Sequence, residues 1–426
     1  MLPILGVHIN FEWSSLWPLV ILIAIGVSIP VLLSILKLKF IPVFVVEILV
    51  GLIIAHIPFM RDIFVISHDG AYEFNSLASG LYSIGMAMLL FLSGLDTDTR
   101  AIKTDIKNNH KTLNTFKLSW IFIGSVILLS FIGSLLFIPY YKNVLFGIVL
   151  ITIVFSSTFA SLTIPLIHVE NLQSTTIGKL ICTYSTISEM MSIVSISILL
   201  IIQSDYKNLW QILILLAILG LTYILRKIGK LEVFKDKMEG IVFLGIRLII
   251  LLLLTSIIIT AQSGAEFILG AFLSGMIIKT TKIKHKTIEI FEAVGFGIFI
   301  PIFYLLVGIN VGVTIDFTNP IVLLLIGILF VMFIATKLPF LSLLKWFPAK
   351  TVIPTMFIVS STIIVALTCE HFGVIESELM DSLIIASSLT CIIPPILFDI
   401  FEIDKKYGTS RLKYDSIIID PYDIKK

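Results

Sequence analysis

Residues 178–203 read GKLICTYSTISEMMSIVSISILLIIQ, a hydrophobic stretch with one acidic residue, Glu189, near its middle. The stretch is long enough to cross a bilayer as a helix. A charged carboxylate at that depth is costly unless it is paired, protonated or wetted. Hydroxyl side chains recur at helical spacing on or beside the face of Glu189, at Ser185, Ser188, Ser192 and Ser195. The pattern predicts that this helix lines an ion path; an acid held by a structural partner is the alternative.

The rest of the chain is equally apolar. Of 426 residues, 58% are hydrophobic and 14% are charged, with a mean hydropathy of +1.08. A soluble domain carries about a quarter charged residues. We therefore predict an all-α polytopic membrane protein whose partner is the lipid bilayer, without a role in nucleic-acid binding. The three cysteines show no CxxC spacing, so neither a disulfide framework nor a metal centre is indicated.

Counting stretches of about 20 apolar residues gives the number of predicted transmembrane helices. There are thirteen, near residues 16–36, 40–57, 81–96, 117–138, 144–167, 177–203, 209–225, 240–260, 264–281, 295–314, 319–342, 351–369 and 379–400. With the N-terminus outside and the C-terminus cytoplasmic, 25 of the 30 Lys and Arg residues fall in inward loops or the tail, and three fall outside. This distribution obeys the positive-inside rule and favours that orientation.

Two of the predicted spans contain the same triplet inside an apolar run. Ser156, Ser157 and Thr158 lie in one span, and the second triplet is Ser360, Ser361 and Thr362. The spans run in opposite directions, as expected for the inverted repeats of secondary transporters, in which two discontinuous helices cross at mid-membrane. The alternative is that Ser and Thr occur here because small residues favour close helix contacts.

Three further charges are predicted to lie within the bilayer. Lys337, in LFVMFIATKLPFLSLLKW (329–346), is about 12 Å from the inner end of its span, close enough to balance Glu189 when no metal ion is bound. The alternative is a lysine that snorkels to the interface. Glu47 and Arg247 share a depth of about 10 to 12 Å, which favours a structural ion pair.

Several stretches together resemble the second cation:proton antiporter family, the bacterial sodium or potassium/proton exchangers. They include IPVFVVEILVGLIIAHIP (41–58), where Val46 replaces a glycine of the family pattern, and LYSIGMAMLLFLSGLDTD (81–98). Further matches are GAFLSGMII (270–278), FGIFIPIFYLLVGINV (296–311), FSSTFASLTIP (155–165), EHFGVIESELMDSLIIASSLTCIIPPIL (370–397) and the span of Lys337. The resemblance covers nearly the whole chain.

The resemblance implies a core bundle that moves against an interface bundle, in a homodimer. The interface bundle would comprise residues 1–115 and 239–317, and the core bundle 116–204 and 318–401. Residues 205–238 would form a linker helix and 402–426 a short cytoplasmic tail.

The resemblance also implies roles for single residues. Glu189 matches the ion-binding acid, Thr158 the threonine at the unwound crossing and Lys337 the basic residue of the eleventh span. Two departures stand out: Ser188-Glu189 replaces the usual acidic pair, and the second crossed helix lacks the frequent Pro-Arg pair.

The sequence therefore predicts an antiporter of the plasma membrane that exchanges protons for Na+ or K+ without a cofactor. The single monovalent-cation site would be Glu189, with Ser188, Thr158, Ser157 and Ser185 as further ligands. Because Ser188 bears no charge, we expect one-for-one electroneutral exchange; the alternative is that Lys337 itself releases a proton, which would make the exchange electrogenic. The alternative is a channel-like or sensory membrane protein of the same fold without coupled exchange. No enzyme motif of the metalloprotease or serine-hydrolase type occurs, so we expect no enzymatic activity.

Overall fold

The computed structural model describes a helical protein. The described residues are 17–36, 42–68, 71–96, 115–160, 176–203, 285–341 and 373–401, with parts of 163–167, 246–254 and 270–278 and the single residues 355 and 362. The first elements are α1 (Trp17–Ile35), α2 (Val43–Ala55), α3 (Pro58–Arg61), β1 (Val65–His68), β2 (Ala71–Phe74), α4 (Ser76–Asp96), α6 (Thr115–Ser134) and η2 (Leu135–Tyr140). They are followed by α7 (Val144–Ser156), α9 (Thr176–Gln203), α14 (His285–Val294), η4 (Gly295–Phe299), α15 (Ile300–Thr314), α16 (Pro320–Thr336), α17 (Leu338–Leu341) and α20 (Ser377–Phe401).

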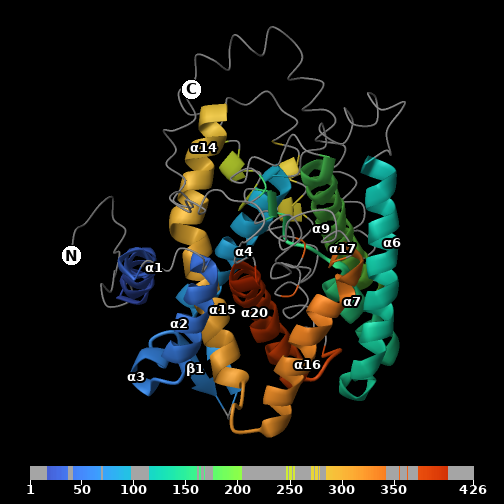
Figure 1. The fold of residues 1–426 in the computed structure, drawn as a ribbon. Helices are drawn as coiled ribbons and strands as arrows, with labels where there is room; N and C mark the ends of the chain where they lie inside the picture. Colours follow the sequence, from blue (N-terminus) through green and yellow to red (C-terminus); the bar gives the residue numbers. More distant parts are fainter. Residues whose placement is uncertain are drawn as a thin grey trace, which may run out of the picture.

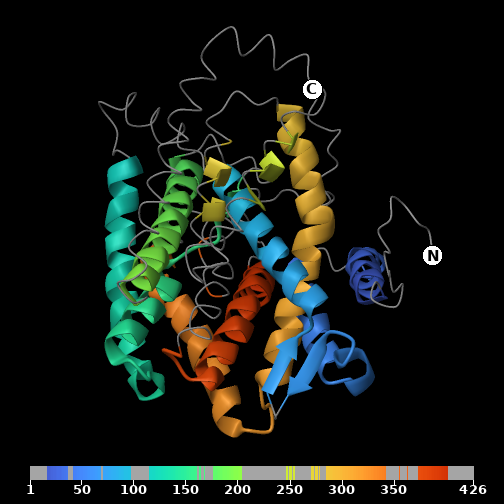
Figure 2. The same cartoon turned by 180° about the vertical axis from the view of Figure 1, so that it is seen from behind.

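The helices form two groups that flank a central region. α15 packs on α1, α2 and α4, whereas α6 packs on α7, α9 and α16. α20 packs mainly on α16 and also touches α2 and α15, so it lies between the groups, as Figures 1 and 2 show from opposite sides. α1 lies at the edge of the assembly (Figure 1). The arrangement places α4 and α9, which carry the residues discussed below, across this central region from each other (Figure 2).

The described helices support a chain that crosses a membrane repeatedly. Four of them are long and apolar enough to span a bilayer: Trp17–Ile35, Ser76–Leu95, Lys117–Tyr140 and Ile288–Thr314. α2, α7 and α16 are shorter apolar helices. The predicted span at 209–225 lies outside the described residues, as does most of 351–369, so the number thirteen stays a prediction.

One small element departs from the all-α prediction. β1 and β2 form an antiparallel hairpin, with Val65 opposite Phe74 and Ile66 opposite Glu73. The sequence between them contains Asp69-Gly70, a strong hairpin signal. A search for apolar stretches of membrane length passes over such a short element, which explains why the prediction missed it.

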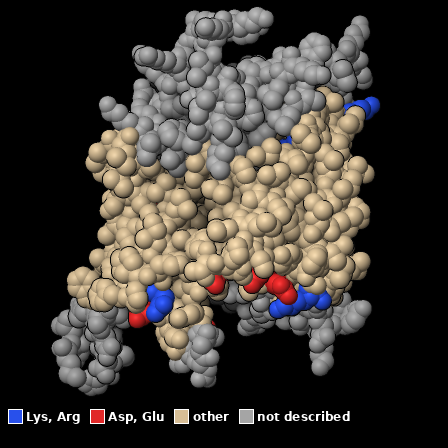
Figure 3. Space-filling model, turned by 60° about the horizontal axis from the view of Figure 1, so that its bottom comes forward, with Lys and Arg blue, Asp and Glu red and all other residues tan. Residues whose placement is uncertain are grey.

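The described surface is apolar along its flanks. Large apolar side chains point outward, for example Ile121 and Leu128 of α6 and Leu324 and Val331 of α16, each at least 60% exposed. In Figure 3 most of the charged side chains in view lie along the lower edge of the described surface, further Lys or Arg side chains lie toward the opposite end, and the flanks carry other residues. A broad exposed apolar belt of this kind matches a lipid environment.

α7 ends in the middle of its predicted span. The helix stops at Ser156, residues 157–159 are not helical, and Ala160 is the first helical residue after them. Thr158 Oγ1 donates a weak hydrogen bond of 3.4 Å to Thr355 O, which links this break to the second predicted crossed span. α7 is therefore interrupted inside the predicted span, whereas a pair of crossed discontinuous helices stays a prediction, because most of the second span is not described.

Glycines allow two pairs of helices to approach closely. A Cβ atom on Gly51 of α2 would overlap the carbonyl oxygen of Leu305, and a Cβ atom on Gly308 of α15 would overlap that of Ile48. Each glycine thus faces the carbonyl group of the residue three positions before the glycine of the other helix. The same reciprocal pattern joins Gly94 of α4 to Gly275, through the carbonyls of Phe272 and Phe91. Small residues at such contacts are typical of helix packing in membranes.

We predict that Gly308→Ala destabilises the protein. The new methyl group collides with the backbone of α2, which cannot rotate away as a side chain would, so the two helices must separate. Overpacking of this kind costs about 1–3 kcal/mol. Thermal unfolding of the purified protein in detergent should show a lower melting temperature. Gly327→Ala on α16, where a Cβ atom would meet nothing within 4 Å, is the matched control. Equal melting temperatures for the two variants would contradict the predicted packing.

Candidate ion-binding site

Glu189 lies on α9 in the interior, 3% exposed, and both of its carboxylate oxygens accept hydrogen bonds. Ser93 Oγ of α4 donates to Oε1 at 2.9 Å. The backbone N–H of Ala160 donates to Oε2, also at 2.9 Å. Donors of this kind stabilise a charged carboxylate without neutralising it. The carboxylate is therefore stabilised inside the bundle, and it lies at the junction of α4, α9 and the break after α7.

The amide of Ala160 is available because the helix is interrupted. The first N–H groups of a helix have no partner within it and carry a partial positive charge. Glu189 supplies the missing acceptor from α9. The break therefore selects a negatively charged group on the Ala160 side, which is a local electrostatic reason for an acid at this position.

Lys337 occupies the other side of the same break. Its ammonium group is fully buried and donates to Ser156 O at 3.0 Å and to Ser157 O at 2.7 Å. It also lies 3.2 Å from Tyr184 Oη. The carbonyls at the end of a helix lack intrahelical partners and carry a partial negative charge. The lysine thus neutralises the carbonyl side of the break as Glu189 neutralises the amide side.

Lys337 and Glu189 do not form the direct contact that the sequence suggested. In the described part of the chain no ion pair within 4.0 Å joins them, and the hydrogen bonds of the ammonium group go to the α7 carbonyls, Thr158 and Tyr184. Backbone groups of the break engage each side chain separately: the Ala160 amide donates to Glu189, and the Ser156 and Ser157 carbonyls accept from Lys337. The lysine is also not at the interface, since its side chain is buried, so snorkelling does not describe it.

The residues predicted as ligands of the cation have different hydrogen-bond partners in the structure. Ser157 supplies its carbonyl to Lys337, and Thr158 Oγ1 lies 3.4 Å from the ammonium nitrogen. Ser188 donates to Ser156 O at 2.9 Å rather than contacting the carboxylate. Ser185 Oγ is buried and has no hydrogen-bond partner in the described part of the chain. Ser185 is therefore a hydroxyl whose lone pairs are unused in this arrangement.

The remaining predicted residues are described only in part. Ser360 and Ser361 lie outside the described residues, whereas Thr362 is buried. Glu47 is buried at 2% exposure but Arg247 is exposed, and the described residues include no ion pair between them. The predicted pair is thus not observed. Two residues predicted to lie at the same depth in a membrane need not contact each other, because depth does not determine the direction in which a side chain points.

Two contributors were missed by the sequence reasoning. Ser93 lies within a stretch of α4 that drew attention only as a family-like segment, and nothing in the sequence places it next to Glu189. Tyr184 lies on α9 four residues before Ser188, so helical spacing could have identified it as a neighbour of the break. Its ring packs on Phe340 at 4.4 Å between centroids and lies 5.7 Å from the Lys337 ammonium.

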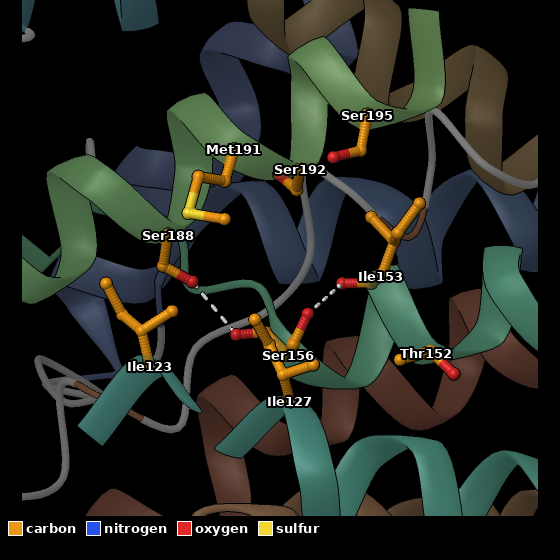
Figure 4. Close-up of a pocket in the computed structure, with 9 residues that line it drawn as sticks. All are labelled: Ile123, Ile127, Thr152, Ile153, Ser156, Ser188, Met191, Ser192 and Ser195. Carbon is orange, nitrogen blue, oxygen red and sulfur yellow. Dashed lines mark hydrogen bonds between the residues drawn. The ribbon is translucent and has the colours of Figure 1, made fainter. Parts of the chain in front are cut away.

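A cavity of about 170 Å³ lies beside the break, between α6, α7 and α9 (Figure 4). Hydroxyl groups and apolar side chains line it together: Ile123, Ile127, Thr152, Ile153, Ser156, Ser188, Met191, Ser192 and Ser195. Figure 4 shows Ser188 pointing to the backbone oxygen of Ser156, and Ser156 Oγ bonded to Ile153 O. The cavity has room for more than one water molecule. Ser192 and Ser195, two of the hydroxyls predicted to lie beside Glu189, therefore line a cavity whose wall is mainly apolar, and the ion path stays a prediction.

Comparisons with known proteins show what the chain is similar to over most of its length. The family model described as "Sodium/hydrogen exchanger, transmembrane" matches residues 19–399. The chain is 26% identical over 407 residues to the "Putative Na(+)/H(+) antiporter YjbQ" of Bacillus subtilis (strain 168), covering 90% of this chain and 63% of that protein. It is 25% identical over 337 residues to the "Probable Na(+)/H(+) antiporter 3" of Methanocaldococcus jannaschii, covering 74% and 82%, respectively. A "Na(+)/H(+) antiporter" of Enterococcus hirae is 24% identical over 59% of this chain and 64% of its own length.

We predict that Lys337→Met lowers the stability of the folded protein. Methionine keeps much of the length of the side chain but donates no hydrogen bond, so the carbonyls of Ser156 and Ser157 lose the hydrogen bonds from the ammonium group. The loss of hydrogen bonds from a charged donor costs about 1–3 kcal/mol. The melting temperature in detergent should fall, whereas Lys142→Met, at an exposed lysine, should leave it unchanged. An unchanged melting temperature for Lys337→Met would show that the ammonium group does not stabilise the interruption after α7.

Proposed function

Because this chain belongs to the sodium/hydrogen exchanger family, we propose that it is an antiporter, rather than an enzyme, that exchanges protons for a monovalent cation across the membrane. The observation that carries the proposal is the placement of Glu189. Its carboxylate is buried at a helix break and accepts hydrogen bonds from Ser93 and Ala160. A single acid of this kind can bind a proton or a cation, but not both at once.

Competition for Glu189 would couple the two fluxes. When the carboxylate is protonated, it has no charge to attract a cation; when a cation is bound, the proton must have left. If the site can change the side of the membrane to which it is open only when a proton or a cation is bound, proton movement in one direction requires cation movement in the other. This is alternating access around one site, and the broken helix beside Glu189 is the type of element that secondary transporters use for it.

Nearby oxygen atoms would complete the cation site. A hard cation needs several oxygen ligands, and the carboxylate supplies at most two. Ser185 has an unused buried hydroxyl four residues before Glu189, which supports its assignment as a ligand. Ser188 and Thr158 are held by other partners in this arrangement and would have to turn toward the ion. While they turn, Lys337 would continue to donate hydrogen bonds to the carbonyls of Ser156 and Ser157.

The names of the relatives favour Na+ as the cation, since those of the three relatives compared above describe Na(+)/H(+) antiporters. The chain spans only 63% of the first of these relatives, so the substrate is part of the proposal. K+ is the second candidate. Cavity size and the number of oxygen ligands select between monovalent cations, and both are set by the loaded site.

The reciprocal glycine contacts support an inverted repeat. One contact joins α2 to α15, that is, the second predicted span to the tenth. The other joins α4 to the segment 270–278, the third predicted span to the ninth. If spans one to three repeat as spans eight to ten, span two corresponds to span nine and span three to span ten. The contact between spans two and ten then corresponds to the contact between spans nine and three.

We propose on this basis that α2, α4 and α15 belong to an interface bundle and α6, α7, α9, α16 and α20 to a core bundle. A homodimer in the plasma membrane with the N-terminus outside completes the proposal.

A channel-like or sensory protein of the same fold is the second candidate. It is favoured by one observation: Ser188, at the position of the first acid of the usual pair, is bonded to the backbone of α7 and carries no charge. The two functions differ in their coupling. An exchanger dissipates an imposed pH gradient when cation is added and saturates with cation concentration, whereas a channel passes current without an obligatory proton.

We predict that Glu189→Gln abolishes cation-driven proton movement in proteoliposomes. Glutamine is nearly isosteric and can still accept a hydrogen bond from the Ala160 amide, but it binds neither a proton nor a cation at neutral pH. The readout is the collapse of a pH gradient, followed with a fluorescent dye, after addition of NaCl, KCl or LiCl. Glu376→Gln, at an exposed acid, should exchange as the wild type does. Exchange that persists in Glu189→Gln would remove this residue from the site.

We predict one-for-one exchange, without net charge movement. The site holds one acid, because Ser188 cannot ionise, and Lys337 is engaged by the backbone rather than by the acid. The exchange rate should therefore not respond to a membrane potential imposed with valinomycin and K+ during Na+ transport. A rate that depends on the potential, and still does so in Lys337→Gln, would contradict this stoichiometry.

A further inference from the structure

The hydrogen bond between Ser93 and Glu189 joins the two groups of helices. Ser93 lies on α4, which packs on α15 and η4, whereas Glu189 lies on α9, which packs on α6 and α7. The bond is 2.9 Å long, and both residues are less than 5% exposed. A hydrogen bond to a charged group that is shielded from water is among the stronger ones in proteins. The predicted ion-binding acid is thus held from the opposite group of helices.

The position of Ser93 is fixed by the helix packing next to it. Gly94 follows Ser93 directly and sits against the carbonyl of Phe272, while Gly275 sits against the carbonyl of Phe91. These contacts are between backbones, so they leave α4 little freedom to rotate or slide at this level. Ser93 therefore presents its hydroxyl to Glu189 as a consequence of how α4 packs on residues 270–278.

The two donors to Glu189 differ in what they can do when the site is loaded. The backbone N–H of Ala160 only donates, so Oε2 always accepts from it. A serine hydroxyl has one donor hydrogen and two acceptor lone pairs. It can donate to the empty carboxylate, accept from a protonated Oε1, or turn its lone pairs to a cation. Ser93 can thus adapt to all three states, which Ala160 cannot.

We propose that Ser93 is a ligand of the transported cation, supplied to Glu189 by the opposite group of helices. The site would then be complete only while α4 and α9 face each other as they do here, and it would lose one ligand when the groups move apart. The chemistry recognised is that of a small dehydrated monovalent cation, which prefers hydroxyl and carboxylate oxygens. This inference rests on the proposed exchange at Glu189 and adds a residue that the ligand set above does not contain.

The experiment compares Ser93→Ala with two other variants in proteoliposomes. Loss of one ligand to a charged species should raise the KM for Na+ about tenfold, with the maximal rate nearly unchanged. Ser93→Thr keeps a hydroxyl and should restore most of the affinity. The matched control is Ser83→Ala on the same helix, where the hydroxyl bonds within α4 to Ser79 O and the KM should stay at the wild-type value.

A second measurement separates binding from transport. Na+ should raise the melting temperature of the wild-type protein in detergent, and Ser93→Ala should require about tenfold more Na+ for the same rise. A KM and a Na+ titration that both match the wild type would overturn the role of Ser93 while leaving exchange at Glu189 intact. No exchange in wild-type vesicles would instead overturn the proposed function, and with it the inference that rests on it.

Discussion

The structure depends on how one interrupted helix satisfies its backbone inside the membrane. No water is available in the hydrocarbon core to bond a free N–H or C=O group, so a break there must be supplied with partners by the protein. At the end of α7 the Phe155 carbonyl accepts from Thr336 and the Ser156 carbonyl accepts from Ser188 and Lys337, while the amide of Ala160 donates to Glu189. The break therefore accounts for a buried base and a buried acid within one small region, each on the side that matches its charge.

Under the proposed exchange, this arrangement would let Glu189 bind a proton or a cation without leaving Lys337 unpaired. If Lys337 and Glu189 were directly paired, a proton or cation on Glu189 would leave a buried ammonium group without a partner, at a large cost. In the structure the ammonium group donates to the carbonyls of Ser156 and Ser157, which do not depend on the charge of Glu189. The neutral Ser188 fits the same scheme, because a second acid at that position would face those carbonyls and compete with them for the lysine.

Close helix packing gives this site its geometry. In lipid, helices gain little from burying apolar side chains, and contact depends on small residues that let backbones approach. Gly51, Gly94, Gly275 and Gly308 make two such contacts with one shared pattern. They hold α2 on α15 and α4 on residues 270–278, so the group that carries Ser93 is rigid near the carboxylate. The other group, with α9, meets it through the polar contact at Glu189.

The sequence by itself determined the class of protein and most of the helix positions that the structure describes, and it identified Glu189 and Lys337 as charges that lie in the interior. Each of these follows from local properties: apolar length, the cost of a buried charge and residue order. Tertiary structure alone decided which groups touch. It placed Ser93, 96 residues before Glu189 in the chain, on the carboxylate, turned Lys337 to the carbonyls and left Arg247 exposed. The sequence indicates how far along its helix a residue lies and which face of that helix it occupies. Which residue of another helix it contacts depends on how whole helices pack.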